Sequence, residues 1–221
     1  METIRRTRPG RPRHIPDRGD GASPRDQILG AAARLFVNNG FAGTSTREIA
    51  DLVGIRQASL YYHFAGKDDI VAELLERTVR PTLDGLDELA HVEGTETRLY
   101  TLAFRDAQVL AEVMYNIGLL PSLPDVIQAE VGTEYEEARQ ELRHAYGVLG
   151  LSCATEAVTS TIGKHQLGGL ILQNVESVIR TRVDGDTVDE DALHAVAASC
   201  LRICGVPEDR VQAAAEAAPV S

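Results

Sequence analysis

Residues 45–64, STREIADLVGIRQASLYYHF, decide the fold of this chain. Ser45 followed by Glu48 forms a capping box, in which the hydroxyl accepts from the third helical amide and the carboxylate reaches back. Gly54 ends the helix, because glycine enters the left-handed conformation without steric cost. Apolar residues at helical spacing predict the buried face of this helix: Ile49, Leu52 and Val53. The stretch therefore begins as a short capped helix that stops at a glycine turn.

A second short helix is expected after the turn. Leu60 and Phe64 lie four residues apart and share one face, and Ile55 fills the corner between the helices. The side chains left on the outer face are those of Arg56, Gln57, Ala58, Ser59, Tyr61, Tyr62 and His63. Glutamine pairs with adenine, arginine with guanine and alanine with the thymine methyl, whereas tyrosine and serine hydroxyls suit phosphates. This layout is typical of a helix-turn-helix, which places its second helix in the major groove of DNA.

The flanking segments extend the same unit. Ser23 and Pro24 open an earlier helix as N-cap and first helical residue, and Gly40 closes it. Lys67 begins a later helix, whose first turn carries carboxylates where the helix dipole favours them. Between these points run the segments ILGAAARLFVNNGFAGTSTREIA, DLVGI and LYYHFAGKDDI. Over Ile28–Leu75, less than a quarter of the chain, the sequence resembles the TetR family of bacterial transcriptional regulators.

The resemblance implies a role for each matching position. Thr46 and Arg47 would begin their helix against the DNA, with Arg47 on a base edge or a phosphate. Bases would be read by Gln57, Ala58 and Tyr61, and phosphates would be held by Ser59, Tyr62, His63 and Lys67. Two positions depart from the family, since many relatives have a capping serine in place of Arg56 and glycine in place of Ala58. Losing that cap typically costs about 1 kcal/mol, which Arg56 can return through a phosphate or guanine contact.

Charge is divided unevenly along the chain. The net charge of −11 is unexpected for a DNA-binding protein. Residues 1–67 carry 11 Lys and Arg against 6 Asp and Glu, whereas residues 68–221 carry 11 against 27. The positive charge therefore lies where DNA is expected, and the acidic remainder is repelled from it.

Composition favours an all-α protein that is not an enzyme. Hydrophobic residues make up 43% of the chain, and there is no tryptophan. The sequence contains no nucleophile elbow, phosphate loop, paired catalytic carboxylates or metal-ligand set, so we expect neither a metal nor a cofactor. Cys153, Cys200 and Cys204 lack the spacing of a disulfide framework or a zinc site. We expect buried thiols in a reducing cytoplasm, with oxidant sensing as the alternative, and neither a signal peptide nor a membrane span.

Residues 1–22 are rich in Arg, Pro, Gly and Asp and are predicted to be disordered in the absence of DNA. Within them, residues 8–13 read RPGRPR and resemble the core of an AT-hook. An extended Gly-Arg-Pro segment fits the narrow minor groove, whose potential attracts arginine. We therefore predict that Arg11 binds the minor groove, and a merely basic, solubilising tail is an equal alternative.

Only helices are expected from Lys67 onward. Their ranges are 67–89 with a bend at Pro81, 95–118, a short helix after Pro124, 132–148, 153–181 and 188–204, and a frayed or short helical tail follows Pro207. The expected organisation is thus a three-helix helix-turn-helix domain over residues 23–67 and a larger helical ligand-binding and dimerisation domain over residues 68–221.

The last two long helices are rich in small residues: Gly168, Gly169, Ala195, Ala197, Ala198 and Ser199. The resemblance implies that these helices pair with their copies in a four-helix dimer interface. A dimer also suits the DNA side, because two-fold symmetry gives a palindromic operator with half-sites about 34–36 Å apart, or a multiple of that. The alternative is that the small residues pack inside one subunit.

The helix over residues 95–118 mixes polar with apolar side chains. Asp106 falls on its apolar stripe, where an unpaired carboxylate is costly to bury, and Arg105 and His144 are candidate partners. A small-molecule site needs an apolar cavity with a few polar groups, and the resemblance implies an inducer held among helices four to eight, as in TetR relatives. We predict a pocket lined partly by Phe104, Gln108, Met114 and Tyr115, with ordinary core or surface as the alternative for each.

Together these features predict a homodimeric, cytoplasmic repressor that binds double-stranded DNA and is released by a small-molecule inducer of unknown class. A ligand in the helical domain would shift the helix that begins at Lys67 and spoil the spacing of the two recognition helices. A DNA-bound interaction protein, whose helical domain binds another protein, is the alternative. An activator also fits the sequence, and no membrane is involved in any of these interpretations.

Overall fold

The computed structural model describes residues 22–123, 126 and 133–220. Within these ranges the chain forms helices joined by turns, with no strand, which confirms the all-α prediction. Among the described helices, none is long and apolar enough to cross a bilayer. The predicted basic arm, apart from its last residue, and Arg11 within it lie outside the described residues.

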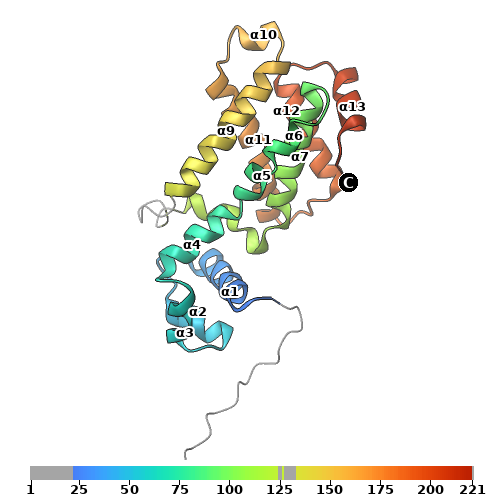
Figure 1. Ribbon diagram of the computed structural model, residues 1–221. Helices are drawn as coiled ribbons and strands as arrows, with labels where there is room; N and C mark the ends of the chain where they lie inside the picture. The colour runs from blue at the N-terminus through green and yellow to red at the C-terminus, as the bar shows by residue number, and fades with distance from the viewer. Residues whose placement is uncertain (1–21, 124–125, 127–132, 221) are drawn as a thin grey trace, which may run out of the picture.

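The helices group into two parts joined by one of them. In chain order they are α1 (Pro24–Asn39), α2 (Thr46–Val53), α3 (Gln57–His63), α4 (Lys67–Glu76), α5 (Arg80–Asp84), α6 (Leu86–Leu89), α7 (Thr95–Glu112), the 3-10 helix η1 (Met114–Ser122), α9 (Thr133–Cys153), α10 (Glu156–Thr159), α11 (Lys164–Val183), α12 (Glu190–Ile203) and α13 (Glu208–Ala217). Figure 1 shows α1, α2 and α3 at one end of the molecule, here called the head, and the helices from α5 onward as a larger body. Helix α4 runs between them, and both α1 and α4 contact η1 of the body.

The body is built around α7, which packs against α9, α11 and α12. Helices α9 and α11 approach each other so closely that a Cβ on Gly168 would collide with the backbone of Arg143 and Gly147, so this contact requires glycine. Ala197 and Ala198 are buried as well. Gly168, Ala197 and Ala198 therefore pack inside one subunit, which was the alternative to a role in the dimer interface. Gly169, Ala195 and Ser199 keep part of their surface exposed.

Helix α7 ends at Glu112, six residues before the predicted end. The guanidinium of Arg182 donates to the carbonyl oxygens of Leu110 and Val113 at 2.8 and 2.7 Å. These bonds satisfy carbonyls that another helical turn would otherwise have used. Tyr115 and Asn116 then adopt φ of 53° and turn the chain into η1.

Two other predicted helices are divided. The range 67–89 breaks after Glu76 and again at Gly85. Pro81 lies in the first turn of α5, where the backbone N–H that proline lacks would have no partner within the helix. The range 153–181 is split into α10 and α11 by a loop that ends at Gly163. Proline and glycine therefore mark helix starts here rather than bends within one helix.

The cysteines are buried free thiols, as the sequence predicted. Cys200 is fully buried, and the side-chain amide of Asn174 contacts its sulfur at 3.2 Å. In the described part of the chain, no group of three or more His, Cys, Asp or Glu is arranged to hold a metal ion.

Candidate nucleic-acid interface

The turn between α2 and α3 has the geometry that its sequence predicts. The amide of Glu48 donates to Ser45 Oγ at 3.2 Å and the Ser45 amide donates to the Glu48 carboxylate at 2.8 Å, so both halves of the capping box form. Gly54 ends α2 in the left-handed region with φ 78° and ψ 28°. Leu60 and Phe64 are buried and fix α3 against the rest of the head.

One residue of the predicted buried face of α2 is exposed. Ile49 and Ala50 are buried and Val53 is half-buried, but Leu52 is 40% exposed. The buried arc of this short helix lies between the directions of Ile49 and Ala50, which Val53 shares and Leu52 does not. The prediction of Leu52 as a buried residue was therefore wrong.

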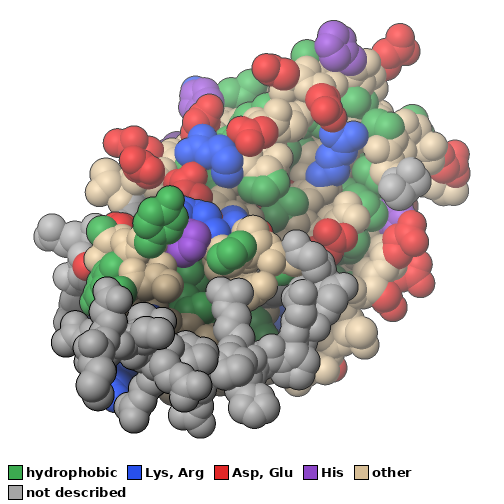
Figure 2. Space-filling view, turned by 60° about the horizontal axis from the view of Figure 1, so that its bottom comes forward, with side chains coloured by type: hydrophobic (Ala, Val, Ile, Leu, Met, Phe, Trp, Pro, Cys, Tyr) green, Lys and Arg blue, Asp and Glu red, His purple; other side chains and the backbone are tan. Residues whose placement is uncertain are grey.

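The outer face of α3 carries the predicted DNA-contacting side chains. Tyr62 is 86% exposed and Tyr61 is 49% exposed, whereas His63 is half-buried. The other members of this face are all exposed: Arg56, Gln57, Ala58 and Ser59. Figure 2 brings the lower end of Figure 1 forward and shows acidic side chains spread over the upper part of the view, where the body lies.

Two of these polar side chains, Gln57 and Tyr61, bind each other and Thr46 of α2. Gln57 Nε2 donates to Thr46 Oγ1 at 2.9 Å and lies 3.4 Å from the hydroxyl of Tyr61, which itself lies 3.1 Å from Thr46 Oγ1. We call this set the Thr46–Gln57–Tyr61 cluster. It joins the first residue of α2 to two successive turns of α3 and so fixes the rotamers of side chains that the sequence assigned to DNA.

The two basic residues predicted for the same surface differ in their surroundings. Arg47 is highly exposed and only loosely paired with Asp51, at 3.9 Å. Lys67 Nζ instead donates to the carbonyl oxygens of Phe41 and Thr44, at 2.8 and 3.3 Å, and lies 4.3 Å from the centre of the Phe41 ring. An ammonium group has three donors, so Lys67 holds the α1–α2 loop with two and keeps one for any phosphate.

Arg56 precedes α3 as its N-cap and makes no side-chain cap hydrogen bond. The structure therefore leaves the amides of the first turn of α3 without the side-chain acceptor that a capping serine would supply. Arg56 is exposed, so its guanidinium can bind an anion from outside the protein.

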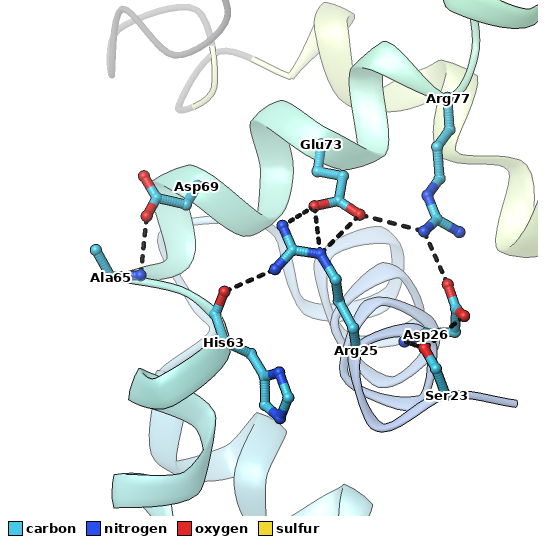
Figure 3. A network of polar contacts seen from close by, with 8 residues as sticks. All are labelled: Ser23, Arg25, Asp26, His63, Ala65, Asp69, Glu73 and Arg77. Atoms are coloured by element: carbon cyan, nitrogen blue, oxygen red, sulfur yellow. Dashed lines mark hydrogen bonds and ion pairs between the residues drawn. The ribbon is translucent and has the colours of Figure 1, made fainter.

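A polar network ties the head to α4 (Figure 3). The guanidinium of Arg25, in α1, pairs with Glu73 of α4, donates to the His63 carbonyl at 2.8 Å and lies 4.1 Å from the centre of the Phe64 ring. Arg77 pairs with the same Glu73 at 3.2 Å and with Asp26 at 2.8 Å. Through Glu73 and Arg77, α4 is therefore linked both to α1 and, by way of Arg25, to the end of α3.

The body contains a cavity of about 320 Å³, lined by α7, η1, α9, α11 and the turn after α4. Asp106 of α7 lines it and is buried, as the apolar stripe predicted. Its partners are the hydroxyls of Thr82 and Tyr146, not the predicted Arg105 or His144. Arg105 pairs with Glu88 at 3.1 Å, and His144 is exposed.

Three of the four predicted ligand-binding residues, Phe104, Gln108 and Tyr115, do not line this cavity. Phe104 is buried against the ring of His194, with 4.7 Å between the ring centres. Gln108 donates to Glu112 one turn later at 3.0 Å, and Tyr115 is 48% exposed. Met114 begins η1, and its side chain lies outside what the structure describes. The lining residues Thr78, Arg139 and Glu176 were missed, because helices far apart in the sequence supply them.

A helix-turn-helix with an exposed second helix defines a DNA-binding regulator, and the comparisons agree. The model of the bacterial regulatory proteins of the tetR family matches residues 28–74. The repressor KstR2 of Mycolicibacterium smegmatis is 46% identical over 54 residues, which are 24% of this chain and 26% of that protein. The regulator QacR of Staphylococcus aureus is 43% identical over 51 residues, or 23% and 27% of the two chains. These matches span only about a quarter of each relative.

Similarity to solved structures extends over nearly the whole chain. Mycobacterium smegmatis AmtR superposes with a TM-score of 0.76 and 36% sequence identity, covering 90% of this chain and 95% of that one. A γ-butyrolactone receptor superposes with a TM-score of 0.63 and 26% identity, covering 87% and 94%. The chain belongs to the TetR family, a family of transcriptional regulators and not of enzymes.

Proposed function

We propose that this protein is a transcriptional repressor that binds a palindromic operator as a homodimer in the cytoplasm and is released by a small molecule. The observation that carries the proposal is the outer face of α3, whose polar side chains are exposed while Leu60 and Phe64 anchor the helix from behind. KstR2, which matches the head, is named as a repressor. The proposed DNA-binding domain spans residues 23–67 and the ligand-binding and dimerisation domain residues 68–221.

The side chains of α3 divide into base and phosphate contacts by their chemistry. We assign Gln57, Ala58 and Tyr61 to base edges, because amide, methyl and hydroxyl groups match the pattern in the major groove. The assigned phosphate or backbone contacts are Thr46, Arg47, Arg56, Ser59, Tyr62, His63 and Lys67, with Arg11 in the minor groove. Thr46, in the cluster with Gln57 and Tyr61, then positions both readers as well.

The dimer interface is proposed on the outer faces of α11 and α12. Gly169 of α11 and Ala195 of α12 keep exposed surface, and Leu170, next to Gly169 in the sequence, is 40% exposed. Leu170→Glu should therefore yield monomers in sedimentation experiments. Val148, on the solvent face of α9 and 43% exposed, supplies the matched control Val148→Glu, which should stay dimeric. Equal behaviour of the two variants would count against this interface.

Release by a ligand is proposed to run through η1 and the turn after α4. The cavity is lined by Gly118 and Ser122 of η1 and by Thr78 and Val79 of that turn. Because η1 and α4 also contact α1 of the head, a molecule that moves these walls moves the head. The ligand must bind the non-DNA conformation more tightly, and DNA must weaken the ligand by the same factor.

The DNA assignment is tested by retarding labelled duplexes in a gel, with an operator first selected from random oligonucleotides. Gln57→Ala should reduce the preference for the operator over random DNA by roughly 1–3 kcal/mol. Tyr62→Phe removes one hydroxyl from an almost fully exposed side chain and should weaken both duplexes alike. If the Gln57 variant lost affinity for both duplexes equally, its base-reading role would be wrong. If the wild type retarded no duplex at low salt, the proposed function would fail.

A further inference from the structure

The cavity in the body contains a buried carboxylate without a cationic partner. Asp106 is 1% exposed, and it accepts from Thr82 Oγ1 at 2.9 Å and from Tyr146 Oη at 2.7 Å. Both donors are neutral hydroxyls. Each carboxylate oxygen accepts one of these bonds and keeps a further lone pair for another donor.

The cavity's other charged groups do not supply the missing counter-ion. Arg139 is engaged by Glu176 through two hydrogen bonds of 2.9 and 2.8 Å. Glu136 adds another carboxylate, and among the described residues no second Lys or Arg and no His lines the cavity. Residues 124–132 contain no basic residue in the sequence. The lining thus carries three carboxyl groups against one guanidinium.

Burial makes this carboxylate costly in the free protein. It raises the pKa of Asp106 to about 6, against the opposing effect of the Tyr146 and Thr82 hydrogen bonds, and the charge of Glu176 adds to the increase. At neutral pH the group is therefore mostly ionised while only hydroxyls stabilise it. A cation brought into contact with it would gain a charge-assisted hydrogen bond in a desolvated site.

We propose that the cavity binds a small organic cation, an ammonium or amidinium group on a short apolar body, with Asp106 as its counter-ion. The volume of about 320 Å³ is at the lower end for small-molecule sites, so the body of the ligand is short. Apolar contacts for it come from Leu110, Leu142 and Ile179. The inference rests on the proposed function in taking this cavity as the inducer site.

The binding test uses four probes of similar shape on the full-length chain: benzamidine, benzylamine, benzyl alcohol and benzoate. Thermal unfolding and titration calorimetry should show binding of the two cations and neither of the others. Asp106→Asn keeps the shape and one acceptor oxygen for Tyr146, turns its amide nitrogen into a donor toward the Thr82 hydroxyl and removes the charge, and it should weaken cation binding by roughly tenfold or more. Glu137→Gln removes an exposed carboxylate from α9 outside the described cavity lining and should leave binding within about twofold.

Three results would overturn the inference: equal binding of cations to the wild type and to Asp106→Asn, equal binding of benzyl alcohol or benzoate, or no binding of any probe. Gel retardation of the selected operator, measured on the same samples, separates this failure from that of the proposed function. If the cationic probes show no Asp106-dependent binding while the protein still retards the operator, only the proposed class of ligand is refuted. Absence of retardation refutes the regulator, whatever the probes do.

Discussion

The energetic cost of ionising Asp106 gives a stability prediction of definite sign. Folding raises the pKa of this carboxyl from 3.8 to about 6, so the folded protein binds its proton more tightly than the unfolded chain does. The stabilisation from this group is complete below pH 3.8 and is lost as the pH rises through about 6. The difference between a pKa of 3.8 and one of about 6 corresponds to about 3 kcal/mol of folding free energy.

Asp106→Asn should abolish the loss of stability that ionisation of Asp106 causes at higher pH, because the amide stays neutral. Its oxygen can still accept a hydrogen bond from Tyr146, and its nitrogen can contact Thr82. The variant should become more stable relative to the wild type as the pH rises from 4 to 7.5, by up to about 3 kcal/mol. At pH 4 the two proteins should differ by no more than about 1 kcal/mol, the cost of an imperfect amide hydrogen bond.

Urea unfolding at equal protein concentration, followed by circular dichroism at a series of pH values, measures this difference. Other carboxyl groups titrate in both proteins and cancel in the comparison. Glu136→Gln, at an exposed carboxylate of the same cavity, should show no such pH-dependent gain. A difference between variant and wild type that stays constant with pH would show that Asp106 is not desolvated. A difference of opposite sign would reveal a cation beside it.

Three further tests concern the packing, the capping and the ion pairs that position the head and the body. Gly168→Ala should destabilise the protein by about 1–3 kcal/mol in urea unfolding, because the new methyl group meets the backbone of Arg143, whereas the methyl group of Gly169→Ala meets only the Arg143 side chain at the ordinary contact distance of 3.9 Å and should be nearly neutral. Ser45→Ala breaks the capping box and should lower stability by about 1 kcal/mol and weaken operator retardation; unchanged retardation would mean that α2 needs no cap. Arg25→Gln removes one of two ion-pair links from α1 to α4, leaving that of Asp26 with Arg77, and should reduce the response of DNA binding to any inducer, with little effect on inducer affinity itself; an unaltered response would exclude the Arg25 contacts from coupling.

Local sequence signals predicted the head in detail. Both N-caps at Ser23 and Ser45 form, and Gly54 ends α2 in the left-handed region, because each of these depends on residues within four positions along the chain. The failure at Leu52 has a different origin. An eight-residue helix with apolar residues over a wide arc does not show from sequence alone which part of the arc meets α1.

The body was less predictable because distant residues shape it. Arg182 ends α7 from about seventy positions further on, and the hydroxyls that hold Asp106 come from α5 and α9. Pattern analysis placed Asp106 in the core correctly but looked for charged partners. Of the residues that it predicted for a ligand pocket, Phe104, Gln108 and Tyr115 do not line the cavity that the helices form. Contacts between residues so far apart in the sequence depend on how whole helices pack together. The spacing of residues along a single helix does not predict that packing.

The Thr46–Gln57–Tyr61 cluster bears on how the protein finds its target. Over arbitrary sequence the three groups satisfy one another, so the protein can diffuse along the duplex by backbone attraction alone without leaving polar atoms unpaired. If Gln57 reads bases as proposed, it exchanges its hydrogen bond with Thr46 only for a base edge that binds it more strongly. We therefore expect fast scanning interrupted by rare, abrupt arrests, with the internal hydrogen bonds setting the threshold for stopping.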